Sequence, residues 1–344
     1  MAVSRAEQIR PNREYHLAGS GDTEVRVLYW APGATQQVVN DLVTAMRTVG
    51  DVMRLYPCFQ LRAMVFRGTA DQVALGEWMF QRLDALSHAQ ATAQQRQSPA
   101  TYDYLAATGG DTAARIVYLS PTTTEQNMNE LYTAVHTVVD VSREFAAYQT
   151  KALVMRSTPD RIAAAEWMVA KLNGPASTQQ PSLYVRPNPA PYDEPVVRVH
   201  FLRTEAQEGR LDLATMLRPM TDMYKMFVNA SPAALTFSGS AEKVALADWL
   251  LDELDRPVND QGAAQPRKNP APYSFRERGD ESVVRVPYPI HTAADRLDEM
   301  AALLHTSTGI SRAFVYRPAG ALVFRCKPDQ VELAEKLIAE QDKL

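Results

Sequence analysis

Val65-Phe66-Arg67-Gly68-Thr69 recurs three more times along the chain. Its counterparts are Val154-Met155-Arg156-Ser157-Thr158, Thr236-Phe237-Ser238-Gly239-Ser240 and Val323-Phe324-Arg325-Cys326-Lys327. Further on, three copies have an acid followed by tryptophan, Glu77-Trp78, Glu166-Trp167 and Asp248-Trp249, and the fourth has Glu335-Lys336 at this place. Self-similarity at a regular spacing is typical of an array of structural units. We therefore predict four tandem modules.

The four copies, each of roughly 80 to 90 residues, fill most of the chain of 344 residues. We expect modules at 1–86, 100–175, 190–257 and 269–344, with linkers at about 87–99, 176–189 and 258–268. The later linkers share a motif, Asn188-Pro189-Ala190-Pro191-Tyr192 and Asn269-Pro270-Ala271-Pro272-Tyr273. This repetition predicts extended arms that dock in part, although simple duplication of a linker would explain it too.

The pattern within one module predicts five elements. Val25 to Tyr29 alternates as a half-buried strand, and Gln36 to Val49 has the apolar spacing of a helix. Two short strands follow at 53–59 and 63–67, and a second helix comes after Thr69. The prediction is an α+β fold of four two-layer βαββα modules, each a three-stranded sheet with both helices on one face.

The helix ends have specific signals. Thr69, Thr158 and Ser240 suit N-caps, and Gln72 completes a capping box with Thr69. Pro159 and Pro328 fit the first helical position. Short polar residues or glycine are expected at the exit of the first helix, and the four copies have Asp51, Asp140, Asp222 and Gly309 there.

Basic residues recur at three positions of the module. Strand one carries Arg26, Arg115, Arg198 and Arg285; strand two begins with Arg54, Arg143, Lys225 and Arg312; strand three ends with Arg67, Arg156 and Arg325, where the third copy has Ser238. Alternation predicts that the first and third rows share the uncovered face of the sheet. Arginine beside apolar residues is typical of a protein interface, but also of a solvated sheet face. For strand two we expect a contact with the nearby helix exit, such as Asp51.

Composition excludes several classes of protein. The net charge of −4 gives no reason to expect a nucleic-acid partner, and no apolar run is long enough for membrane insertion. Because the first residues are polar, we expect a periplasmic or exported protein only if a leader was removed, and otherwise a cytoplasmic one. Cys58 and Cys326 are expected to be buried thiols.

No constellation predicts catalysis, a metal site or a cofactor. The six histidines occupy no common position of the repeat: His16, His88, His136, His200, His291 and His305. The recurring acids at 71, 160, 242 and 329 fall in first helical turns, where they favour the helix dipole. The repeated tryptophans suit a core. We therefore expect that the protein is not an enzyme.

The chain resembles the small periplasmic N-domains of bacterial secretins. Val65-Phe66-Arg67-Gly68-Thr69 and Leu75-Gly76-Glu77-Trp78 carry the resemblance, together with the layout of all four copies. The resemblance implies building of rings or filaments by packing of modules side to side within an envelope assembly. The outer-membrane barrel region of secretins has no counterpart in the sequence, so we expect a soluble relative or partner of the family.

Two functions follow as hypotheses. The first is an interaction scaffold, homo-oligomeric or docked on an envelope complex, with Arg26, Arg67, Arg115, Arg156, Arg198, Arg285 and Arg325 as interface residues. The alternative is a KH-like RNA-binding array, which would need a GxxG loop that no copy has. An enzyme acting on a carbohydrate or small molecule has no residues to support it.

Overall fold

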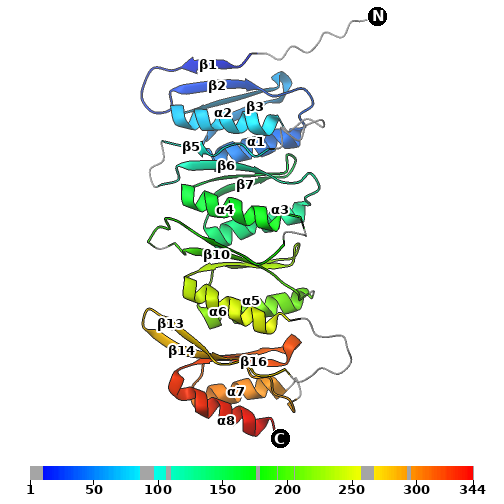
Figure 1. Cartoon of the computed structure of the whole chain (residues 1–344). Helices are drawn as coiled ribbons and strands as arrows, with labels where there is room; N and C mark the ends of the chain where they lie inside the picture. The colour runs from blue at the N-terminus through cyan, green and yellow to red at the C-terminus, as the bar shows by residue number, and fades with distance from the viewer. Residues whose placement is uncertain are drawn as a thin grey trace, which may run out of the picture. The chain divides into compact units, whose positions relative to one another are not determined.

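The computed structural model describes residues 11–85, 97–105, 110–175, 179–191, 193–204, 206–256, 267–292 and 296–343. The chain divides into two compact units, Met1–Ala176 and Ser177–Leu344. Each unit contains two modules (Figure 1). Most of the expected linkers at 87–99 and 258–268, the first residues of the one at 176–189, and His88 lie outside the described residues.

Every module has a four-stranded antiparallel sheet rather than the expected three strands. In the first unit the sheets have the orders β1-β2-β4-β3 and β5-β6-β8-β7. Module 1 contains β1 (Arg13–His16), β2 (Glu24–Tyr29), α1 (Gln36–Thr48), β3 (Arg54–Cys58), β4 (Ala63–Gly68) and α2 (Ala70–Asp84). Module 2 contains β5 (Tyr102–Asp103), β6 (Ala113–Tyr118), α3 (Glu125–Ala134), the π-helical turn η2 (Val135–Val139), β7 (Arg143–Ala147), β8 (Ala152–Ser157) and α4 (Pro159–Leu172).

The second unit repeats this order. Module 3 contains β9 (Ser182–Val185), β10 (Val196–Phe201), α5 (Gln207–Thr221), β11 (Met226–Asn229), β12 (Ala234–Gly239) and α6 (Ala241–Leu254). Module 4 contains β13 (Tyr273–Glu277), β14 (Asp280–Arg285), α7 (Leu297–Thr308), β15 (Arg312–Tyr316), β16 (Ala321–Cys326) and α8 (Val331–Gln341). The pattern of each module is therefore ββαββα.

The additional strand comes from the arm before each module. Tyr15, Tyr102, Tyr184 and Tyr273 occupy one register position, opposite Val25, Ala114, Val197 and Val284. The three-stranded prediction was wrong because these edge strands are short and largely exposed, so they lack the alternation of a half-buried strand. The strand β9 lies in the expected linker at 176–189 and belongs to module 3.

The repeated proline motif does not occupy equivalent places in its two copies. In module 4 it leads into β13, and the Asn269 side chain accepts a hydrogen bond from the Tyr288 backbone N–H at 2.7 Å. In module 3 residues 188–191 lie between β9 and β10, and Tyr192 lies outside the described residues. Docked arms are thus confirmed by the strands themselves rather than by the motif.

The helix-end predictions are confirmed with one correction. Thr69, Thr158 and Ser240 are N-caps, and Thr69 forms its capping box with Gln72. Pro159 begins α4, whereas Pro328 begins a 3-10 turn, η6 (Pro328–Gln330), that precedes α8.

Of the two cysteines, Cys326 is buried, and its burial raises the pKa of the thiol to about 11. Cys58 is only half-buried, contrary to the expectation that both thiols are buried.

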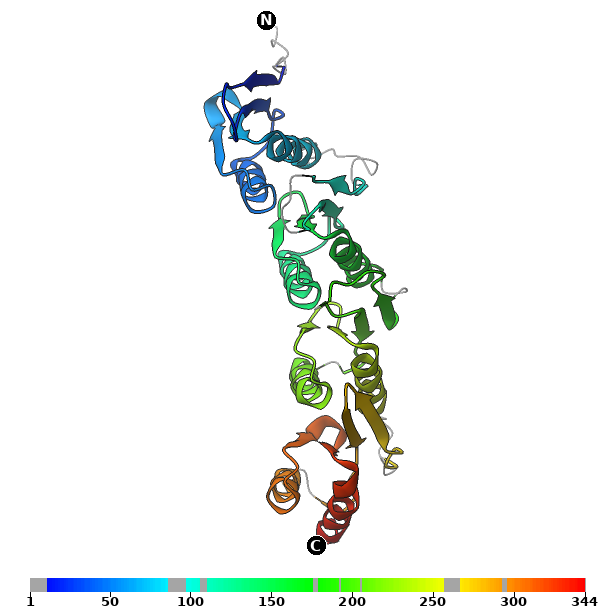
Figure 2. The same cartoon turned by 90° about the vertical axis from the view of Figure 1, so that its left-hand side faces the viewer.

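Both helices of a module lie on one face of its sheet, as predicted; Figure 2 shows the two helices of module 2 side by side beneath their strands. In the first unit α1 also packs on β7 of the next module. Ala114, Ile116 and Val154 of module 2 therefore belong to the same apolar cluster as the core of module 1. The second unit repeats this arrangement, because α5 packs on β15. The first module of each unit thus contributes a helix that packs on the sheet of the second.

Candidate protein-interaction site

The helix-one exit is a tight left-handed turn in every module. Asp51, Asp140 and Asp222 have φ angles of 55°, 61° and 54°, and Gly309 has 71°. Only glycine and short polar residues such as aspartate adopt this conformation readily. The turn ends the helix, and in modules 1 and 3 it leaves the carboxylates of Asp51 and Asp222 facing the next sheet of the unit.

In the first unit the Asp51 carboxylate binds an arginine pair of module 2. Arg143 and Arg156 donate to its two oxygens, and Arg143 also lies 3.3 Å from Asp111 of its own module. Only 2 % of Arg156 is exposed, and its guanidinium lies 4.6 Å from the centre of the Tyr104 ring. The contact is therefore charge-assisted, with Arg156 buried while Asp51 and Arg143 remain partly exposed.

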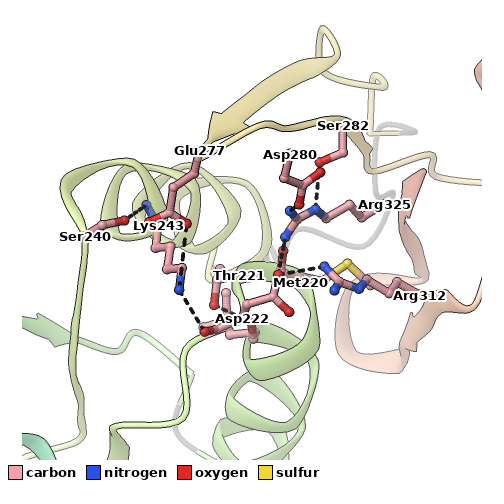
Figure 3. A network of polar contacts seen from close by, with 11 residues as sticks. Met220, Thr221, Asp222, Ser240, Lys243, Glu277, Asp280, Ser282, Arg312 and Arg325 are labelled. Atoms are coloured by element: carbon pink, nitrogen blue, oxygen red, sulfur yellow. Dashed lines mark hydrogen bonds and ion pairs between the residues drawn. The ribbon is translucent and has the colours of Figure 1, made fainter. Parts of the chain in front are cut away.

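The second unit has the same junction (Figure 3). Asp222 accepts from Arg312 at 2.9 Å and from Arg325 at 3.1 Å. Arg325 also donates to the Met220 carbonyl at 2.7 Å and to the Ser282 hydroxyl at 2.8 Å. It forms an ion pair with Asp280 and lies over the Phe275 ring at 4.2 Å.

The backbone of the exit turn is held by its own module. The carbonyl of Asp51 accepts from the Gln72 side chain at 3.2 Å, and that of Asp222 accepts from Lys243 at 3.3 Å. Both donors lie in the first turn of the second helix, so the capping region of that helix fixes the position of the turn. The carboxylate is therefore positioned before it meets the next module.

Aromatic contacts accompany the charges. Trp78 packs on Tyr102 of the next module, and Trp249 on Tyr273, both with 5.2 Å between ring centres and 41° between planes. The Tyr118 hydroxyl donates to the Arg82 carbonyl at 3.0 Å, and Tyr288 donates to Glu253 at 3.1 Å. The tryptophans at 78 and 249 are thus junction residues, only half-buried, rather than simple core residues.

Two acidic residues are buried near this junction, Asp41 of module 1 and Glu144 of module 2. Asp41 of α1 accepts from the Gln149 N–H at 3.2 Å, and burial raises the pKa of its carboxyl. On β7, Glu144 faces the helices of its own module, 3.2 Å from His136, and burial raises its pKa to about 9. Raised pKa values in a cleft point to active sites, but Glu144 is buried within the module.

The strand-one arginines do not share a face with the strand-three arginines, and that prediction was wrong. Arg26 lies opposite Phe66, so it faces the helices, where Glu77 accepts from it at 3.3 Å. Arg198 pairs with Asp248 at 2.8 Å, and Arg115 and Arg285 pair with Glu166 and Glu335. Because an acid of the second helix neutralises each guanidinium, these arginines can lie beside the core while Val25 and Val27 face the other side.

The strand-three arginines do lie on the open face, as predicted. Arg156 and Arg325 are buried there by the preceding module, whereas Arg67 is exposed. Two strand-two arginines, Arg143 and Arg312, bind the exit of the preceding module, Asp51 and Asp222, rather than their own. The third, Arg54, pairs with Asp22 of its own module and not with Asp51. The sequence did contain a signal for the contact between strand one and the second helix. In every copy a basic residue on strand one accompanies an acid just before the tryptophan position.

No helix in the described part of the chain is long and apolar enough to span a membrane. Among the same residues, no three histidine, cysteine or acidic side chains cluster as a metal site would require.

No family model and no curated protein matches the sequence. Among solved structures, ExeD of Aeromonas hydrophila is similar with 15% identity and a TM-score of 0.17, over 68% of this chain and 42% of that chain. A chain of the ETEC pilotin–secretin AspS–GspD complex is similar with 11% identity and a TM-score of 0.17, over 89% of this chain and 58% of that chain. This chain thus spans less than two thirds of either. The likeness to secretin chains is distant, and at these TM-scores it carries no argument about function.

Proposed function

We propose that this chain is a non-catalytic interaction protein whose secretin N-domain-like modules act as a scaffold by self-association or by docking in a cell-envelope assembly. One observation carries the proposal: the junction between neighbouring modules occurs once in each unit with the same chemistry. A helix exit bearing an aspartate binds an arginine pair, and a tryptophan packs on an edge-strand tyrosine. A surface that is used twice within one chain is a ready-made element for assembly between chains.

The composition of the junction supports this role. Tryptophan, tyrosine and arginine are the residues that dominate the free energy of protein interfaces. Here they lie beside buried apolar residues such as Val154 and Val323. The envelope location rests on the sequence motifs alone, and we propose a periplasmic or exported protein accordingly.

Solution mass and shape test this proposal. Sedimentation velocity over a wide range of concentrations should show species larger than the 38.3 kDa monomer, or a larger species once envelope extract is added. Crosslinking with mass spectrometry then identifies the contacting surfaces. A chain that remains monomeric at every concentration and acquires no crosslinked partner in the extract would contradict the proposal.

Charge reversal should locate the contact. The suitable variant is Arg54→Glu with Arg67→Glu, because both side chains are exposed in module 1 and their reversal should leave the fold intact. Arg156→Glu is unsuitable, since that side chain is buried and its reversal would disrupt the fold. The matched control is Arg276→Glu with Arg317→Glu, which changes the net charge equally at exposed positions.

A further inference from the structure

The sheet of module 1 has an open face that its counterparts in modules 2 and 4 do not have. Val65 is 37% exposed, whereas Val154 and Val323 at the same position are fully buried. Tyr56 is 69% exposed on the same face, and Met53, Tyr15 and Leu17 around it are also exposed. Contiguous apolar residues on a surface mark an interaction site.

The arginine pair of this face, Arg54 and Arg67, contacts one aspartate, whereas each junction pair contacts two. In the junctions, each pair binds an aspartate of its own hairpin turn and the aspartate of the preceding helix exit. In module 1, Arg54 lies 3.2 Å from the Asp22 carboxylate, and Arg67 donates to the Asp22 backbone carbonyl at 2.6 Å. Within the described residues these contacts contain no second carboxylate. The face is therefore both apolar and locally positive.

We propose that this open face binds a helix of a separate protein, one with an apolar stripe and an aspartate at its C-terminal exit. The helix would lie across β3 and β4 as α1 lies across β7, with its carboxylate between Arg54 and Arg67. A tryptophan of the same partner would pack on Tyr15, as Trp78 packs on Tyr102. The inference rests on the proposed function, because it names the site and the chemistry of the docking partner.

A second copy of this chain does not offer such a helix in module 4. Arg296 at the N-cap of α7 and Glu299 and Ser307 within it are not buried. Their counterparts Val38 and Asp41 in α1 and Val49 at its C-cap are buried. Gly309 replaces the exit aspartate. Two open faces placed against each other would oppose their arginine pairs, which is unfavourable. Module 4 of a second copy therefore supplies no carboxylate for this face, and we assign the missing carboxylate to a separate protein.

The probe for this site is the chain's own docking helix. We would use a peptide of residues 35–53, labelled with a fluorophore and stapled through the exposed positions Asn40 and Thr44 so that it stays helical. Fluorescence anisotropy measures its binding to the full chain. We expect saturable binding that weakens about tenfold or more for Arg54→Glu with Arg67→Glu. The Arg276→Glu, Arg317→Glu control should bind as the wild type does, and an Asp51→Lys peptide should bind much less.

Each other outcome overturns the inference. A helical peptide that does not bind, or that binds both double variants equally, shows that the face is not a docking site. Binding that appears only after removal of residues 1–10 shows that the chain's own N-terminal segment occupies the face. If the chain self-associates and Arg54→Glu with Arg67→Glu dissolves the oligomer, the occupant is a second copy. Self-association that this variant leaves intact, with no peptide binding, would refute this site while the proposed function stands.

Discussion

Modules 1 and 2 have sheets of the same topology, but one face of the sheet is covered only in module 2. In module 2 the face opposite its own helices is covered by α1 and α2, and in module 1 the corresponding face is open. The arginine pair, the hairpin aspartate and the central valine are present in both. Burial on this face is therefore a property of the neighbour, not of the strands. This difference is the basis for the proposal that the open face of module 1 is a docking site.

The largest expected effect comes from placing a charge at the central valine. Val154→Asp would bury a carboxylate between the modules and should lower the free energy of unfolding by about 4 kcal/mol or more. Val65→Asp, at the open counterpart, should lower it by less than about 1 kcal/mol. Chemical denaturation of both variants makes the comparison. Equal losses would mean that the face of module 1 is covered in solution.

Removing the junction carboxylate should have the next largest effect, and it distinguishes the two units. Asp51→Asn keeps the left-handed turn but removes the carboxylate that Arg156 binds, although Arg156 stays buried. The Nε and Nη1 atoms of Arg156 have no hydrogen-bond partner among the described residues that could compensate. We expect a loss of about 3 kcal/mol. Asp222→Asn should cost about 1 kcal/mol, because Arg325 keeps Asp280, Ser282 and a carbonyl.

Native-state hydrogen exchange of β8 and β16 measures these two losses separately. Asp298→Asn is the matched control, since the Asp298–Arg317 pair is exposed and should contribute less than about 0.5 kcal/mol. A loss at Asp222 that equals or exceeds the loss at Asp51 would contradict the assignment of partners.

On the helix-facing side of the same strands, an acid replaces an apolar residue at one position. Module 2 has the buried Glu144 where module 1 has Leu55, and burial raises the pKa of Glu144 from 4.5 to about 9. The folded state therefore holds a proton that the unfolded state releases, so stability should fall as pH rises from about 4.5 to about 9. Glu144→Gln should remove this dependence and stabilise the protein at pH 8 by about 1–3 kcal/mol. Urea denaturation at several pH values tests it, and parallel curves for both proteins would contradict the shifted pKa.

The smallest difference concerns the edge strands. Tyr102 packs on Trp78, whereas Tyr15 at the same register position is exposed. Tyr102→Ser should cost about 1 kcal/mol, and Tyr15→Ser about 0.5 kcal/mol or less. Thermal denaturation measures both, and a larger loss at Tyr15 would show that it already has a partner.

The sequence predicted the modules, the helix caps and the orientation of strand three, because these depend on local chemistry and on the repeat. Alternation also separated Arg26 from Val25 and Val27, but it could not say which side faces the helices. Both sides of β6 are buried, one by its own helices and one by the preceding module, so the rule that apolar residues face the core gives no answer there. The edge strands were missed because hydrogen bonding to a neighbour, not burial, defines them.

The left-handed turn at the end of helix one has a consequence for how such arrays change in evolution. Aspartate and glycine both allow the turn, so a module with either residue ends its helix in the same way. Only aspartate also supplies the carboxylate for the neighbouring arginines. Each aspartate codon differs from one glycine codon by a single base. One point mutation can therefore remove or restore the carboxylate that binds the neighbouring module while leaving the turn itself intact.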